Sequence, residues 1–172
     1  ASAAKSVRIH GPTECGSCHL PQTEHYLETG HARTLSLAQG PEFLQRFAPR
    51  SVELDFHGRK HELTLRQQQG QVFVGSERFP SGLPIEWLFG SGRHAQTPVT
   101  VHVNPNSRET ESIQFFTTWY RDHGIGRTPG LESLLGDESV STVGVPTDFG
   151  GTVRCFRCHV SDLPFDQTIV HI

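Results

Sequence analysis

The chain has 172 residues, 34% of them hydrophobic, and a formal net charge of −3 at pH 7. This slightly acidic balance, without any basic block, argues against nucleic acid as a partner. No apolar run is long enough to cross a bilayer as a helix. We therefore expect a single water-soluble domain over residues 1–172, without a transmembrane segment.

The first chemical feature along the chain is a pair of closely spaced cysteines followed by a histidine. Residues 15–19 have the pattern C-x-x-C-H, in which two thiols form thioethers with haem vinyl groups and the adjacent histidine binds the iron. Residues 155–159 repeat the pattern, and the two copies use all 4 cysteines of the chain. We therefore expect two covalently bound haem c groups. The predicted attachment residues are Cys15, Cys18, Cys155 and Cys158, with His19 and His159 as iron ligands.

Three other interpretations of the cysteine pairs compete with haem attachment. A thioredoxin-type redox disulfide needs a βαβ context that neither copy has. A shared zinc site does not require a histidine directly after each second cysteine. Structural disulfides suit an exported protein, but a bond within C-x-x-C closes a very short loop and constrains the unfolded chain little. Haem attachment therefore remains the preferred interpretation.

Helical patterns are predicted near the first motif and shortly after it. They fall after Thr13, over His31 to Gln39 and over Glu42 to Phe47, and a further short helix is expected at the second motif.

Between the motifs, alternating apolar and polar residues predict strands. Residues 52–56, 63–65 and 71–74 form a predicted three-stranded meander with turns at Gly58 and Gly70. Further strands are predicted at 85–89, 98–103 and 112–117, and loops at 105–106 and 124–130. The expected fold class is α+β, with a central antiparallel β-sheet and short haem-bearing helices at both ends.

The second axial ligand of each iron must come from a residue other than methionine, because the chain has none. With 11 histidines, bis-histidine ligation and a comparatively low reduction potential are the natural expectation. His31 and His171 each lie twelve residues after a motif histidine, and His94 follows a glycine-rich turn that lets backbone approach a bulky planar group. These three are the candidate distal ligands, with His171 as a rival to His94.

Other polar residues have less specific roles. Arg93 is the candidate partner of a haem propionate, although it could equally be a surface charge. His25 and His123 are weaker ligand candidates, and His61 and His102, like His57, are predicted to face solvent from strands. Trp119, Tyr120 and His123 could line a distal pocket, but packing at the end of a strand is the simpler interpretation.

Several motifs together carry a resemblance to a known family. They are the two C-x-x-C-H copies, Gly30-His31-Ala32-Arg33, Phe89-Gly90-Ser91-Gly92-Arg93-His94, Trp119-Tyr120 and Thr128-Pro129-Gly130. The chain resembles the haem-bearing domain of multihaem cytochromes c found in planctomycetes and related bacteria. This resemblance implies that His31 and His94 are the distal ligands. Family members often continue into further C-x-x-C-H sites, whereas this sequence has two.

The leading functional expectation is single-electron transfer between redox partner proteins through two low-spin haems. One alternative is a haem enzyme, a peroxidase or small-molecule reductase with an open iron site. Another is a haem-based sensor that changes its ligands. Haem attachment occurs outside the bacterial cytoplasm, and the beginning Ala1-Ser2-Ala3-Ala4 is typical of the residues left by signal peptidase, so we expect a periplasmic or otherwise exported protein.

Overall fold

The computed structural model describes residues 18–29, 34–56, 58–103, 110–131, 142–148 and 151. Within these ranges the chain forms two short helices and eleven strands, so the fold is largely β rather than α+β. The predicted antiparallel β-architecture is confirmed, and the predicted share of helix is corrected downward. The helix expected at the second motif lies outside the described residues.

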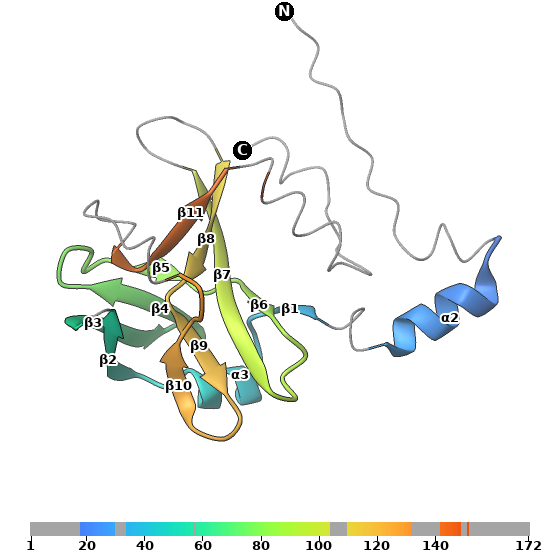
Figure 1. The fold of residues 1–172 in the computed structure, drawn as a ribbon, viewed down its shortest axis with the longest axis horizontal. Coiled ribbons are helices and arrows are strands. Elements are labelled where there is room, and N and C mark those ends of the chain that lie inside the picture. Colours follow the sequence, from blue (N-terminus) through green and yellow to red (C-terminus); the bar gives the residue numbers. More distant parts are fainter. Residues whose placement is uncertain are drawn as a thin grey trace, which may run out of the picture.

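The strands form two antiparallel sheets (Figure 1). The four-stranded sheet has the order β2-β3-β4-β5, and its strands are β2 (Arg50–Phe56), β3 (Arg59–Gln68), β4 (Gln71–Ser76) and β5 (Leu83–Pro84). The predicted meander of three strands is therefore confirmed as β2, β3 and β4. The single central sheet of the sequence-based expectation is instead two sheets.

The larger sheet has seven strands, with the order β1-β6-β7-β8-β11 and a hairpin β9-β10 attached to β7. Its strands are β1 (Leu35–Leu37), β6 (Trp87–Phe89), β7 (Ala95–Val103), β8 (Thr110–Phe115), β9 (Thr117–Tyr120), β10 (Gly124–Arg127) and β11 (Gly144–Thr147). Because every neighbouring pair is antiparallel, β1 and β11 run in the same direction at opposite ends of the five-strand path. Four inter-strand steps separate them, about 19 Å.

Alternating side chains build the hydrophobic core. In β2, Val52, Leu54 and Phe56 are buried, while the residues between them are exposed, as a strand with one covered face requires. Helix α3 (Pro41–Arg46) adds Phe43, and Phe47 follows it. The same core cluster takes in residues of β3, β4, β6 and β8, so it joins both sheets.

Two predicted elements are wrong. Residues 34–39 of the predicted helix His31–Gln39 contain strand β1, because Leu35 and Leu37 alternate with Ser36 and pair with β6. The predicted loop 124–130 begins with strand β10, because Ile125 pairs with Trp119 across a hairpin and packs against the core. The loop expected at 105–106 and residues 31–33 lie outside the described residues.

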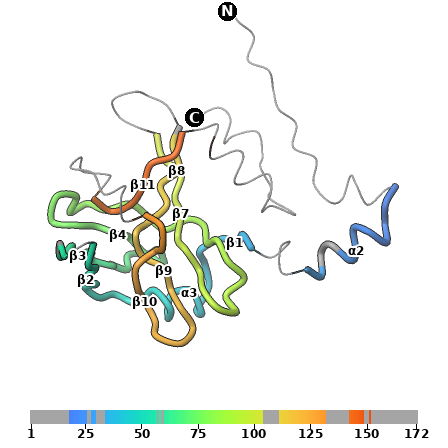
Figure 2. Tube along the Cα trace, viewed as in Figure 1, coloured from blue at the N-terminus to red at the C-terminus, as the bar shows by residue number. Residues whose placement is uncertain are grey.

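Helix α2 (Leu20–Glu28) follows the first motif and confirms the helix predicted there. Figures 1 and 2 show it apart from the two sheets, on the side of the molecule where β1 lies. We call the described residues from Thr34 onward the body. No helix in the described part of the chain is both long and apolar enough to cross a membrane.

Candidate functional site

The end of the first C-x-x-C-H motif lies at the start of helix α2. Cys18 and His19 are both exposed, directly before Leu20. The carbonyl oxygen of His19 accepts a hydrogen bond from the amide of Thr23 at 2.9 Å, which closes the first helical turn. A thiol and an imidazole at this position are accessible to a large planar group, so their placement fits haem attachment.

Most of the other predicted haem residues lie outside the described ranges. They are Cys15, His31, Cys155, Cys158, His159 and His171, and their predicted roles stay predictions. Among the described residues, no three histidine, cysteine, aspartate or glutamate side chains gather into a metal-binding group. The described part of the site therefore consists of Cys18 and His19, and of the loop that carries Arg93 and His94.

The loop that carries Arg93 and His94 joins β6 to β7. Its backbone conformation and its close neighbours require glycine at two positions. Gly90 has φ +110, and a Cβ there would lie 2.4 Å from the carbonyl oxygen of Ala95. Gly92 has φ +73, and a Cβ there would lie 2.7 Å from Nη1 of Arg46. The glycines thus permit a tight turn against neighbouring protein atoms, while the expected approach of this backbone to a planar group stays a prediction.

Backbone bonds fix the loop while its two candidate side chains remain exposed. The amide of Arg121 donates to the carbonyl oxygen of His94 at 2.9 Å, so the hairpin β9-β10 holds this end of the loop. The amide of Gly90 donates to the carbonyl oxygen of Thr34 at 2.6 Å. Both Arg93 and His94 are exposed and can meet a group that approaches from outside the body.

The Gly90–Thr34 bond also brings together two segments that are far apart in sequence. Thr34 follows His31 by three residues, and Gly90 precedes His94 by four. Thr34 and Gly90 therefore approach each other at the beginning of β1. This proximity could not be read from the sequence, because it depends on the pairing of β1 with β6.

The aromatic residues considered for a distal pocket have structural partners. Trp119 packs against the core, and the guanidinium of Arg46 lies 4.1 Å from its ring centroid. Arg46 also donates to Oε1 of Gln96 at 2.5 Å and pairs with Glu42. The simpler interpretation, packing at a strand end, is confirmed for Trp119.

Tyr120 and His123 form a separate pair on the hairpin. Their rings stack with centroids 4.5 Å apart, and the Tyr120 hydroxyl donates to the carbonyl oxygen of Arg127 at 2.7 Å. Burial raises the pKa of Tyr120 above its usual value of 10.0. His123 itself is exposed.

Two histidines predicted to face solvent are instead partly buried. The His61 ring lies edge-on to Phe56 and Phe116, and its Nε2 contacts the carbonyl oxygen of Thr142. His102 lies 3.6 Å from a carboxylate oxygen of Glu111 across β7 and β8. Both side chains take part in packing within the body. His57 lies outside the described residues.

Strands β1 and β6 also present an apolar surface that is absent from the sequence-based predictions. Leu35 pairs with Phe89 and Leu37 with Trp87, and we call these four residues the β1/β6 face. The alternation of Leu35, Ser36 and Leu37 is a local indication of a strand. Its pairing partners in β6 lie about fifty positions away, and no local pattern predicts them.

No family model, curated protein sequence or solved structure matches this chain.

Proposed function

We propose that this protein is a dihaem c-type cytochrome that passes single electrons between redox partner proteins. The observation that carries the proposal is the pair of C-x-x-C-H motifs, which together use every cysteine of the chain. The exposure of Cys18 and His19 at the first turn of α2 supports it, since both must reach a macrocycle outside the helix. The resemblance to multihaem cytochromes c points the same way.

Each residue of the two motifs has a defined part in this proposal. Cys15 and Cys18 would hold one haem, and Cys155 and Cys158 the other. His19 and His159 would each bind an iron on the proximal side. When bound, haem supplies an iron that alternates between the ferric and ferrous states.

The distal side is proposed for histidines, because the chain has no methionine. His31 and His94 are the proposed ligands, and His171 remains the rival of His94. Histidine ligation on both sides keeps the potential below that of His/Met cytochromes. Arg93, exposed beside His94, is placed to pair with a propionate, since guanidinium and carboxylate form bidentate hydrogen bonds. Short haem-bearing helices at both ends of the chain belong to the same proposal.

The setting of the protein follows from the same chemistry. Because covalent haem attachment takes place outside the bacterial cytoplasm, the proposed location is the periplasm or an equivalent exported compartment. Partner proteins would meet the haems in weak, transient contacts, as electron-transfer complexes do. The donor and acceptor are open to direct identification by their kinetics of electron exchange.

The first experiment is to count the haems and examine their iron coordination. Intact mass of protein matured in a host that attaches haem c should show two haems per chain. Optical spectra, oxidised and reduced, should show two low-spin irons that do not bind carbon monoxide. A chain without covalent haem would contradict the proposal, and an iron that binds carbon monoxide would favour the enzyme or sensor alternatives.

A matched pair of variants then tests the distal ligand. His94→Ala should convert one iron to a high-spin form that binds carbon monoxide, whereas His123→Ala should leave both irons low-spin. Both histidines are exposed and lie on neighbouring loops, so the pair separates ligation from general loss of a surface histidine. An unchanged spectrum in His94→Ala would transfer this role to His171.

A further inference from the structure

The described residues expose two large apolar side chains, and both follow the first motif. Leu20 is 58% exposed and Leu37 is 45% exposed. Leu20 comes directly after His19 at the start of α2, and Leu37 lies in β1, the next element of the chain. Apolar surface left in water is unfavourable, so these positions would gain from an apolar partner.

Leu37 belongs to the β1/β6 face, whose side chains lie close together. Hydrogen bonds from the Ala38 amide to Glu86 (2.9 Å) and from the Gly90 amide to Thr34 (2.6 Å) flank the ladder between the two strands. Leu35–Phe89 and Leu37–Trp87 are therefore the non-hydrogen-bonded pairs, in which cross-strand side chains approach most closely. These four residues form a continuous apolar surface.

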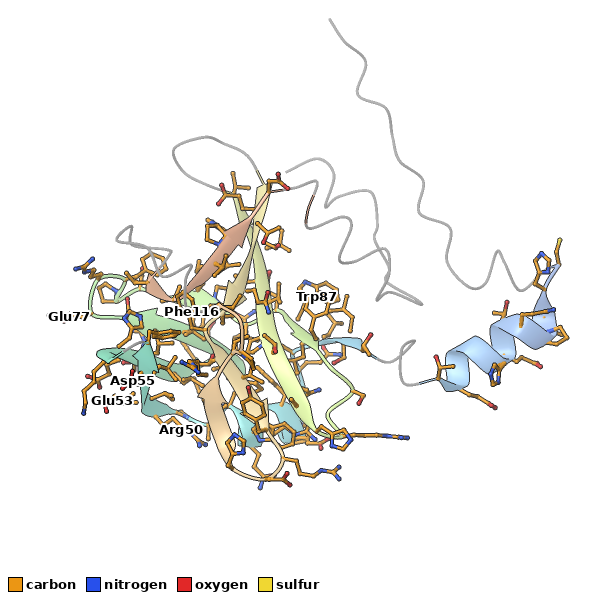
Figure 3. All side chains as sticks on the ribbon, viewed as in Figure 1. Arg50, Glu53, Asp55, Glu77, Trp87 and Phe116 are labelled. Carbon is orange, nitrogen blue, oxygen red and sulfur yellow. The ribbon has the colours of Figure 1, made fainter. Side chains whose placement is uncertain are left out.

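This surface is directed away from the core. Leu88 is 3% exposed and belongs to the core cluster, so its neighbours Trp87 and Phe89 project from the opposite face of β6. Both are half-buried. Figure 3 shows Trp87 on the side of the molecule away from Glu53 and Asp55, which lie on the four-stranded sheet. A planar group could thus reach the β1/β6 face without entering the core.

The covalent path of the chain brings the first motif within reach of this face. Seven residue steps connect Glu28, at the end of α2, to Leu35 and span at most about 24 Å. Helix α2 itself is about 13 Å long, so the segment around Cys18 can fold back onto β1. The loop that carries His94 joins the same two-strand unit through the Gly90–Thr34 bond.

We infer that the β1/β6 face is the surface against which the haem carried by Cys15 and Cys18 packs. This inference rests on the proposed function, and it assigns Leu35, Leu37, Trp87 and Phe89 as haem-contacting residues. The macrocycle supplies the apolar partner that Leu20 and Leu37 require. The same contact would hold α2 against the body.

The second motif is a less suitable source of this haem. Its chain leaves the sheet from β11, which is separated from β6 by three inter-strand steps, about 14 Å. Eight residue steps from Thr147 to Cys155 span at most about 28 Å, so reach alone does not decide between the motifs. We assign the face to the first haem because the two exposed leucines, Leu20 and Leu37, lie in the two elements that directly follow the first motif. The second haem is therefore the explicit alternative in the test.

The decisive experiment adds the same charge to opposite faces of β1. Leu37→Asp places a carboxylate on the β1/β6 face, and Ser36→Asp places one on the other face of the strand, at an exposed neighbour. A negative charge beside a haem stabilises the ferric form. Leu37→Asp should therefore lower one of the two midpoint potentials and leave the other unchanged, while Ser36→Asp changes neither.

Each outcome separates this inference from the proposed function. Intact mass is measured first, and a chain without haem overturns the proposed function. Two haems whose potentials do not respond to Leu37→Asp, or respond equally to Ser36→Asp, overturn only the inference. In a Cys155→Ser/Cys158→Ser background the shift should persist, because the first haem remains. A shift found only when the second haem is present assigns the face to that haem and overturns the inference.

A second measurement uses the protein with all four cysteines and does not depend on those variants. In reduced, diamagnetic protein with ¹³C-labelled leucine methyls, the haem ring current should displace the Leu37 methyl signals, assigned with Leu37→Ile, by more than the indole of the neighbouring Trp87 can. Methyl signals of Leu37 at ordinary leucine positions would overturn the inference.

Discussion

Helix α2 and the body differ in how they bury apolar surface. The body encloses a core cluster that includes Leu63, Phe115 and Phe116, all fully buried. None of the α2 side chains that the structure describes is buried. A nine-residue helix is marginal in water without packing partners. The body therefore has its own source of stability, whereas α2 depends on a partner.

Haem could stabilise the protein in two ways, by completing the core of the body or by ordering the segment that contains α2. The buried cluster gives the body a core built from its own side chains. In our proposal, haem organises the segment that begins at Cys18 and leaves the two sheets largely unchanged. The predictions below test this division, starting with the largest expected effect.

The first prediction contrasts a core side chain with a helix side chain. Phe116 is fully buried and packs edge-on to Phe56, so Phe116→Ala should lower the free energy of unfolding by about 3–5 kcal/mol. Gln22→Ala, at an exposed position of α2, should change it by less than about 0.5 kcal/mol. Urea denaturation followed by the β-sheet circular dichroism signal measures both. Equal effects would show that α2 and the body share one packing unit.

The second prediction concerns the loop that carries His94. Gly90→Ala combines a left-handed backbone with a clash against the Ala95 carbonyl oxygen. Gly40→Ala has a similar φ, +87, with no atom within 4 Å of the added Cβ. We expect about 1–2 kcal/mol for Gly40→Ala and at least about 1 kcal/mol more for Gly90→Ala.

The haem spectrum gives this pair of variants a second readout. Gly90→Ala should disturb the coordination of one iron, because it displaces the loop, while Gly40→Ala should not. Equal stability losses with identical spectra would contradict both the tight turn and the proposed ligand.

The third prediction tests the hydrogen bonds that Glu86 accepts from the large sheet. Oε2 of Glu86 accepts hydrogen bonds from Oγ1 of Thr100 at 2.9 Å and from the Val101 amide at 2.8 Å. Glu86→Ala removes both and should cost about 1.5–3 kcal/mol, whereas Glu86→Gln keeps a carbonyl oxygen and should cost less. Thermal unfolding of the three proteins checks this order. Equal losses in Glu86→Ala and Glu86→Gln would mean that the charge, which both variants remove, matters more than the hydrogen bonds.

The smallest expected effect is a loss of stability at alkaline pH. Burial raises the pKa of Tyr120, and Glu53 raises the pKa of Lys60 by hydrogen bonding at 2.9 Å and by its charge. In both cases the folded protein holds its proton to higher pH than the unfolded chain, so stability falls as pH rises above about 10. Tyr120→Phe should reduce the loss of unfolding free energy with rising pH. Denaturation between about pH 9 and 11, one unit on either side of the usual tyrosine pKa, measures this loss. A fall of unchanged slope would assign the effect to other groups.

Local patterns were sufficient for some elements and not for others. The alternation Val52, Leu54, Phe56 identifies β2 without knowledge of its neighbours, because one face of the strand must be covered. The sequence predicts a helix where the three-residue strand β1 lies, because so short an alternation becomes a strand only through pairing with β6. It predicts a loop at Ile125 for the same reason, since the strand there depends on pairing with Trp119.

The candidate site divides in the same way. Thioether formation and proximal ligation require residues at fixed, consecutive spacing, so the motif at residues 15–19 is legible in the sequence itself. The approach of Thr34 to Gly90 and the pairing of Leu37 with Trp87 each join segments about fifty positions apart in the sequence. Such contacts depend on register, which local residue preferences do not determine.

Strand β1 also bears on how the protein avoids self-association. It is the outermost strand on its side of the described sheet, and an open strand edge is a template for pairing with another chain. Its three residues offer only a few backbone groups, too few to support a long intermolecular ladder. The brevity of this edge therefore limits edge-to-edge pairing between molecules, although Leu37 is in contact with water.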